Sequence, residues 1–91
     1  MKFTWDESKR KSNLSKHGFD FNDAKDVFEG ATLTIEDNRF AYGEQRFITI
    51  GMLKTTVVVI AHTEQSDVIR IISMRKATKY EQKNYFKGFT N

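Results

Sequence analysis

The sequence predicts a single α+β domain in which two N-terminal helices precede a four-stranded, mainly antiparallel sheet and a third helix follows it. Three observations lead to this class. The chain has 91 residues, of which 38% are apolar, enough for one hydrophobic core and too few for two. Apolar residues recur with a helical period before residue 30, and they alternate or run continuously, as in strands, after it. Proline is absent, so the 5 glycines are the main boundaries between elements.

The first helix is predicted to follow a short strand at residues 2–5. Asp6 is a suitable N-cap because its carboxylate can accept hydrogen bonds from first-turn N–H groups, and Gly18 is a suitable C-terminal stop. Between these two residues Leu14 is the single apolar side chain. We therefore expect this polar helix to lie on the surface with few anchoring contacts.

A second, amphipathic helix is predicted to start at Asp20 or Asn22 and to end at Gly30. Its apolar residues lie mostly three or four positions apart: Phe21, Ala24, Val27 and Phe28. This spacing places them on one face of a helix, and we expect that face to pack on the core.

Four strands are predicted from runs rich in Thr, Ile, Val and Phe, and the last helix follows them. The strands are expected at residues 31–36, 45–51, 56–63 and 68–75. Their connections are short, which favours antiparallel neighbours. Thr78 followed by Glu81 is a capping box that opens the last helix, and Gly88 ends it.

Charge is distributed in blocks along the chain, whose net charge is +3. Basic residues outnumber acidic ones over residues 1–16 and 70–91, and acidic residues predominate over residues 17–46. If the two ends meet in the fold, one face becomes basic and can attract a polyanion such as nucleic acid. The alternative is that the lysine and arginine side chains lie on solvent-exposed helix surfaces and bind nothing. The charge distribution alone does not distinguish these two interpretations.

Several classes of function are disfavoured by what the sequence lacks. Cysteine is absent, which excludes disulfides, thiolate metal sites and cysteine nucleophiles. No glycine-rich phosphate loop, HExxH, CxxC or GxSxG motif is present. The 2 histidines lack a paired acid at ligand spacing, so we expect no metal and no other cofactor. The longest apolar run, VVVIA, is far below the ~20 residues of a membrane span, and we expect a cytoplasmic protein without a signal peptide.

Arg70 and Arg75 lie in the segment RIISMR, where two guanidinium groups stand among the apolar residues of a strand. Alternation places them on opposite faces of the sheet unless a bulge intervenes. In one interpretation each arginine pairs with a carboxylate, for which the candidates are Glu44, Glu64 and Glu81. In the other, both arginines bind phosphate oxygens. Further cations can then extend the same phosphate-binding track, namely Lys16, Arg46 and Lys76.

Side chains able to transfer protons each have a structural alternative. His62 lies near the end of the strand VVVIAHT and can exchange a proton near neutral pH, but a histidine there can equally satisfy a backbone carbonyl. His17 and Lys16 end the first helix, where positive charge also stabilises the helix dipole. Aromatic residues of the last helix can stack on bases or pack the helix, namely Tyr80, Tyr85 and Phe86.

Three segments of the chain together carry a family resemblance. They are the opening WDESKRKSNLSKHGFDFNDAKDVF, the middle RFAYGEQRFITIG and, near the end, EQSDVIRIISMRKATKYEQKNY. The most specific pieces are WDE followed by KHG, and RIISxRKA followed by ExxxY. With these pieces in order, the chain resembles the BrnT family of type II bacterial toxins. The resemblance implies a RelE-like fold and a metal-independent ribonuclease that cleaves RNA and inhibits translation. It also implies a BrnA-type antitoxin with a ribbon-helix-helix part, and binding of operator DNA only through the toxin-antitoxin complex.

The resemblance makes the arginines and the titratable residues candidates for a site that cleaves RNA. Arg70 and Arg75, with Lys16 or Arg46, would stabilise the extra negative charge on the phosphorane. Proton transfer would fall to one of four residues that the sequence does not rank: His17, Glu44, His62 and Tyr80. The residues expected to contact RNA are Lys16, Arg46, Ser73 and Lys76.

The sequence is also compatible with two other functions. One is a non-catalytic module that binds nucleic acid and a protein partner. The other is a topoisomerase poison, because RelE-like folds also serve that function. In a toxin, we expect the antitoxin to bind the sheet face or the two N-terminal helices, in a hetero-oligomer of unspecified stoichiometry.

Overall fold

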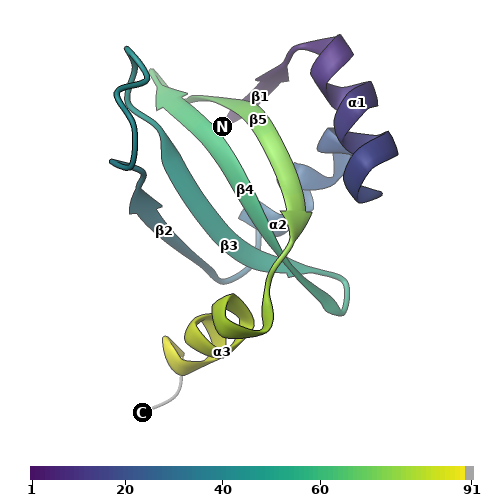
Figure 1. The fold of residues 1–91 in the computed structure, drawn as a ribbon, viewed down its shortest axis with the longest axis vertical. Coiled ribbons are helices and arrows are strands. Elements are labelled where there is room, and N and C mark those ends of the chain that lie inside the picture. The colour runs from purple at the N-terminus through teal and green to yellow at the C-terminus, as the bar shows by residue number, and fades with distance from the viewer. Residues whose placement is uncertain (90–91) are drawn as a thin grey trace.

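The computed structural model describes residues 1–89, which form one mixed sheet of five strands with three α-helices and a short 3₁₀ helix. The strands are β1 (Lys2–Trp5), β2 (Thr32–Glu36), β3 (Phe47–Leu53), β4 (Thr56–Gln65) and β5 (Val68–Lys76). The helices are α1 (Glu7–His17), η1 (Phe21–Asp23), α2 (Ala24–Phe28) and α3 (Lys79–Lys87). The α+β class that the sequence predicts is confirmed (Figure 1).

The strands lie side by side in the order β1-β5-β4-β3-β2. Strands β2 to β5 form an antiparallel meander, as the short connections predict. The two residues between β4 and β5, Ser66 and Asp67, both have the positive φ that a type I′ hairpin turn requires. β1 pairs with β5 in parallel, so the short N-terminal strand belongs to the same sheet and makes it mixed.

The first helix agrees with its predicted caps, whereas the second differs from the prediction. The Asp6 carboxylate accepts a first-turn N–H, and Gly18 ends α1 with a φ of 78°, which glycine adopts without strain. After the cap Asp20 the chain forms the 3₁₀ turn η1 and then only 5 residues of α2. The prediction of one uninterrupted helix is wrong, because the three-residue period of a 3₁₀ turn brings Phe21 and Ala24 to one side, against the sheet.

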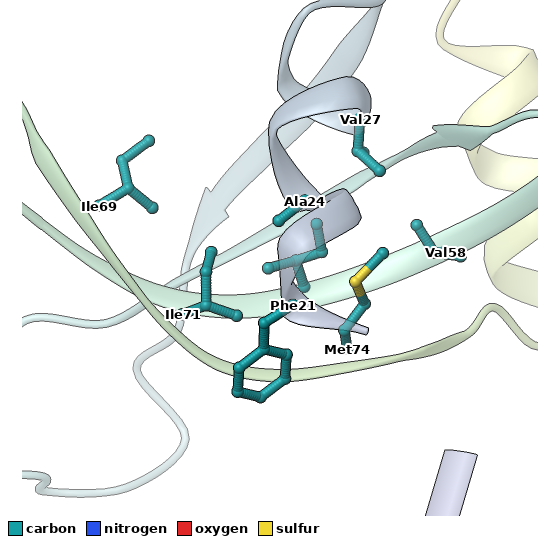
Figure 2. Close-up of a cluster of buried hydrophobic side chains, with 8 residues drawn as sticks. Phe21, Ala24, Val27, Val58, Ile69, Ile71 and Met74 are labelled. Atoms are coloured by element: carbon teal, nitrogen blue, oxygen red, sulfur yellow. The ribbon is translucent and has the colours of Figure 1, made fainter. Parts of the chain in front are cut away.

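η1 and α2 pack on one face of the sheet, which we call the α2 face; α2 lies behind the sheet in Figure 1. The buried side chains of this face, drawn in Figure 2, are Phe21, Ala24, Val27, Val58, Ile60, Ile69, Ile71 and Met74. Gly51 on β3 permits the close approach of α2, because a Cβ at this position would lie 2.7 Å from Cγ1 of Val27. Of the residues predicted to form the apolar side of the second helix, Phe21, Ala24 and Val27 are thus in the core, and Phe28 is partly buried against it.

α3 packs on the opposite face, which we call the α3 face, and covers only one end of it (Figure 1). The capping box of Thr78 and Glu81 opens this helix as predicted. Its contact with the sheet buries Val57, Val59, Ala77 and Tyr85. Beyond the helix the apolar side chains are only partly covered, and Ile35 on β2 is 64% exposed. The α3 face therefore keeps open apolar surface.

Asn13 of α1 is the buried polar side chain that joins this helix to the sheet. Its Nδ2 donates to the carbonyls of Met74 (2.9 Å) and Phe19 (3.0 Å), and its Oδ1 accepts the N–H of Met74 (3.1 Å). β1 pairs with β5 only as far as Ile71, so Met74 lies on a stretch of strand edge that β1 leaves uncovered. The Asn13 amide takes the place of a neighbouring strand there, a role that the sequence analysis missed.

We expect replacement of Asn13 by Ala to lower the free energy of unfolding by about 2 kcal/mol, because the buried N–H and C=O of Met74 lose their partner. Urea denaturation of the purified protein measures this loss. Ser15→Ala, on an exposed position of the same helix, is the control and should change stability little. Equal stability of Asn13→Ala and the control would show that the amide does not fasten α1 to β5.

Candidate functional site

A β-bulge interrupts the pairing of β4 with β5. Ser73 lies opposite Ala61, whereas Ile71 lies opposite the next residue of β4, His62. Ile72 is therefore an extra residue on β5 with no residue opposite it. Because side chains alternate between the two faces of a strand, one extra residue exchanges the faces of everything beyond it.

The bulge brings Arg70 and Arg75 to the same face of the sheet. Strict alternation would separate two residues that lie five positions apart. Arg70 instead lies opposite Thr63, and Arg75 opposite Val59; these two β4 residues are four positions apart and share a face. That face is the α3 face, to which Val59 belongs. Ser73 between the arginines is also paired with this face.

Burial of two core residues accounts for the bulge. Ile71 and Met74 are both almost completely buried on the α2 face, although three positions separate them. In a regular strand an odd separation would turn one of them outward. The extra residue at Ile72 lets both side chains enter the core, and the same shift turns both arginines away from it. Ile72 is itself apolar, so the hydrophobic pattern of the sequence hides this signal.

Arg75 is held by the first turn of α3. Its Nη1 and Nη2 donate to the two carboxylate oxygens of Glu81 at 2.8 and 2.9 Å, the geometry of a bidentate pair. These hydrogen bonds lower the pKa of Glu81 to about 2 against the opposing effect of burial, and they raise the pKa of Arg75. The Arg75 side chain is still 38% exposed, so it can contact a ligand.

Arg70 is held by the loop between β2 and β3. Its Nη2 donates to both carboxylate oxygens of Glu44, at 2.8 and 2.6 Å, and Glu44 also accepts from Nε of Arg46 at 3.3 Å. Burial raises the pKa of Glu44, but the charges and hydrogen bonds of the two arginines outweigh it and lower the pKa overall. Two cations thus share one anion at this end of the α3 face, and the Arg70 side chain is 40% exposed.

The same loop is fixed at its other end by Asp37, which is 8% exposed. Its carboxylate accepts from the side chain and the backbone of Arg39 and from the hydroxyl of Tyr42. The hydrogen bonds from Arg39 hold the pKa of Asp37 well below its usual range, although burial opposes them. Arg39 itself is an exposed cation, and neither it nor Asp37 was singled out by the sequence analysis.

A hollow of about 410 Å³ lies on the α3 face between this loop and α3. Apolar side chains of β2 and β3 line it: Leu33, Ile35, Ile48 and Ile50. Arg39 from the loop and Arg75 from β5 also line it, together with Asn38 and Asn84. Three carboxylate side chains complete the lining: Glu36, Asp37 and Glu81. The hollow therefore combines an apolar lining with two guanidinium groups and three carboxylates.

His62, a proton-transfer candidate, is 1% exposed and lies among the residues of the α2 face. Its Nε2 shares a hydrogen bond of 2.7 Å with Oγ1 of Thr49, and the rings of Phe28 and Phe47 pack against the imidazole. Burial lowers the pKa of His62. This position does not favour contact with a substrate.

The other candidates lie in separate places. Lys16, His17 and Ser73 line a shallow hollow of about 270 Å³ where α1 meets β5. Tyr80 is 75% exposed on α3, next to Glu81 in the sequence. Lys76 lies opposite Val58, a residue of the α2 face, so its backbone position alternates away from that of Arg75. The structure brings Arg46, Glu44 and Arg70 together and does not collect all the predicted residues in one pocket.

Two features are absent from residues 1–89. No group of three or more histidine or carboxylate side chains in this part of the chain could hold a metal ion. No helix formed by these residues is long and apolar enough to cross a membrane.

Fold and site together define a small α+β protein with arginines exposed on one face of its sheet. The sequence identifies the family: residues 5–81 match the family model of the ribonuclease toxin BrnT of type II toxin-antitoxin systems. The chain therefore belongs to the BrnT family of ribonuclease toxins, as the resemblance predicts. No curated protein matches it significantly. Membership in a type II system implies that an antitoxin is its partner.

Burial of His62 predicts a pH dependence of stability. The pKa of this histidine is lower in the folded protein than the value of 6.5 for an unperturbed side chain. The unfolded chain therefore binds the proton more tightly, so the stabilising effect of the neutral form is complete above pH 6.5 and is lost as pH falls through the folded pKa.

We expect the urea midpoint to fall between about pH 6.5 and 5, a range in which most carboxylates do not yet titrate. His62→Gln, which can still hydrogen-bond Thr49, should remove this slope, and His17→Gln on exposed α1 should retain it. An unchanged slope in His62→Gln would assign the dependence to another group.

Proposed function

We propose that the α3 face binds single-stranded RNA and cleaves it without a metal ion, in a RelE-like arrangement. The observation that carries this proposal is the bulge at Ile72, which turns Arg70, Ser73 and Arg75 to one face of the sheet, where Arg75 lines the hollow. Membership in a family of ribonuclease toxins supports the proposed activity. The arginines form a surface suited to a phosphodiester backbone.

The two arginines serve different phosphates in this proposal. Strands rise about 3.3 Å per residue, and the β4 residues opposite Arg70 and Arg75 lie four positions apart, so the backbones of the two arginines are separated by roughly 13 Å. Different carboxylates, Glu44 and Glu81, hold the two guanidinium groups. We assign Arg75 to the scissile phosphate, because it lines the hollow and adjoins α3. Arg70 with Arg46 then holds the backbone farther along the same RNA strand.

The chemistry requires a base to take the proton of the ribose 2′-hydroxyl as its oxygen attacks phosphorus, while the bond to the 5′-oxygen breaks and that oxygen takes up a proton from an acid. The products are a 2′,3′-cyclic phosphate and a 5′-hydroxyl. Arg75 would stabilise the added negative charge of the phosphorane. Among the proton-transfer candidates we favour the accessible side chains over buried His62: His17, Glu44 and Tyr80.

The biological role that we propose follows from the family. RNA cleavage would inhibit translation in the cytoplasm, and a BrnA-type antitoxin with a ribbon-helix-helix part would neutralise the toxin. Binding to operator DNA would then belong to the complex. Membership in the type II ribonuclease toxins supports this role.

Replacing Arg75 by Ala should reduce the rate of RNA cleavage about 100-fold or more, because an anionic transition state loses its cation. Single-turnover cleavage of a labelled RNA by the purified toxin measures the effect. Arg10→Ala is a matched control: Arg10 is also an ion-paired arginine, but it lies on α1 and its partners are Glu7 and Asp20. Its rate should stay near that of the original protein. If Arg75→Ala unfolds while Arg75→Gln, which carries no charge, folds and cleaves normally, Arg75 has a structural role only.

Metal independence and the need for a 2′-hydroxyl give a second test. Cleavage should continue in excess EDTA, and DNA of the same sequence should stay intact because it lacks the attacking oxygen. Gel analysis of 3′ ends should reveal cyclic phosphate or 3′-phosphate. Loss of cleavage in EDTA that is restored by Mg²⁺ would contradict the proposed mechanism.

A further inference from the structure

We propose that the hollow between the β2–β3 loop and α3 is a subsite for one nucleobase of the RNA. The subsite would hold the base of a nucleotide that adjoins the cleaved bond, while the phosphate of that nucleotide lies at Arg75. This inference rests on the ribonuclease activity proposed above and adds the part of the substrate that the hollow recognises.

The lining of the hollow suits the flat, weakly polar face of a base. Leu33 and Ile35 come from β2, and Ile48 and Ile50 lie opposite them on β3, so four aliphatic side chains form one continuous surface. Ile35 is 64% exposed although its side chain is large and apolar. A volume of about 410 Å³ lies within the usual range of pockets for small ligands. A stacked base would remove this apolar surface from water.

Two guanidinium groups at the hollow can contact the phosphate that a nucleotide carries. Arg39 on the loop and Arg75 on β5 both line it, and each guanidinium is oriented by a carboxylate, Asp37 or Glu81. These two carboxylates and Glu36 line the hollow as well, so its positive charges are balanced within the protein. The side chains of Arg39 and Arg75 are nevertheless 68% and 38% exposed, which leaves guanidinium surface for a phosphate. An apolar surface beside exposed guanidinium groups matches a base joined to its phosphate.

Two amide side chains at the hollow can read the edge of the base. Asn38 lies on the loop and Asn84 lies on α3, and both line the hollow. An amide presents a donor and an acceptor, so it can distinguish bases by the pattern of groups on their edges. The subsite therefore predicts a preference for base identity at one position beside the cut.

The test uses RNA in which one base at a time is removed while the ribose and its 2′-hydroxyl remain. The cut is first mapped in a single-stranded RNA, and abasic versions are then made at each position flanking it. The original protein should cleave one of these versions at least about tenfold more slowly than intact RNA, because a stacked base is lost. Ile35→Ser, at an exposed position, should reduce this difference to about twofold or less. Leu14→Ser, an exposed apolar residue on α1, is the matched control and should keep the full difference.

The outcomes separate this inference from the proposed function. If the original protein cleaves intact and abasic RNA equally at every position, the subsite is refuted while the ribonuclease proposal stands. The same holds if Ile35→Ser keeps the full difference between the two substrates. If Ile35→Ser changes only the binding of the antitoxin, the hollow is a protein-docking surface and the inference is wrong. If the original protein cleaves no RNA at all, the proposed function fails and the inference falls with it.

Discussion

The extra residue at Ile72 is the constraint on which the rest of this structure depends. A strand presents alternate residues to its two faces, so a single inserted residue decides which side chains enter the core. Here Ile71 and Met74 both enter it, and Arg70 and Arg75 both leave it. The free energy gained by burying two large apolar side chains stabilises the bulge, and the position of the arginines is a consequence. The Asn13 amide reinforces this arrangement, because it binds both backbone groups of Met74 just beyond the extra residue.

The ion pairs of the two arginines are compatible with a role in ligand binding. Each guanidinium is more than a third exposed, and a pair at such a position contributes little net stability, since solvent screens it. Its main effect is to orient the side chain. Glu81 does this for Arg75 while its own position is fixed by the capping box of α3, so the helix, the carboxylate and the guanidinium form one rigid unit. An oriented cation loses less conformational entropy when an anion binds.

Local signals account for the features of the fold that the sequence predicts. The caps at Asp6 and Gly18 act within a few residues of the chain, and the four strands of the meander follow each other through short connections. The site was predictable to the same extent: Arg70 and Arg75 are conspicuous in an apolar strand, and their partners Glu44 and Glu81 were among the three carboxylates expected. The parallel pairing of β1 with β5, the amide of Asn13 and the bulge depend on residues far apart in sequence, which periodicity does not reveal. Burial of His62 is likewise a tertiary property.

The unequal cover of the two faces explains why one of them is available for recognition. α3 has 9 residues and is about 13 Å long, whereas the 10 residues of β4 extend over about 33 Å. A helix of this length cannot cover the strands of the α3 face in any orientation. The α2 face is closed by side chains of η1 and α2, with α1 fastened along β5. The α3 face thus keeps a continuous apolar surface beside α3, and the same face carries the arginines. Side chains that we propose to bind a base and side chains that we propose to bind its phosphate therefore meet on one face of a single small domain.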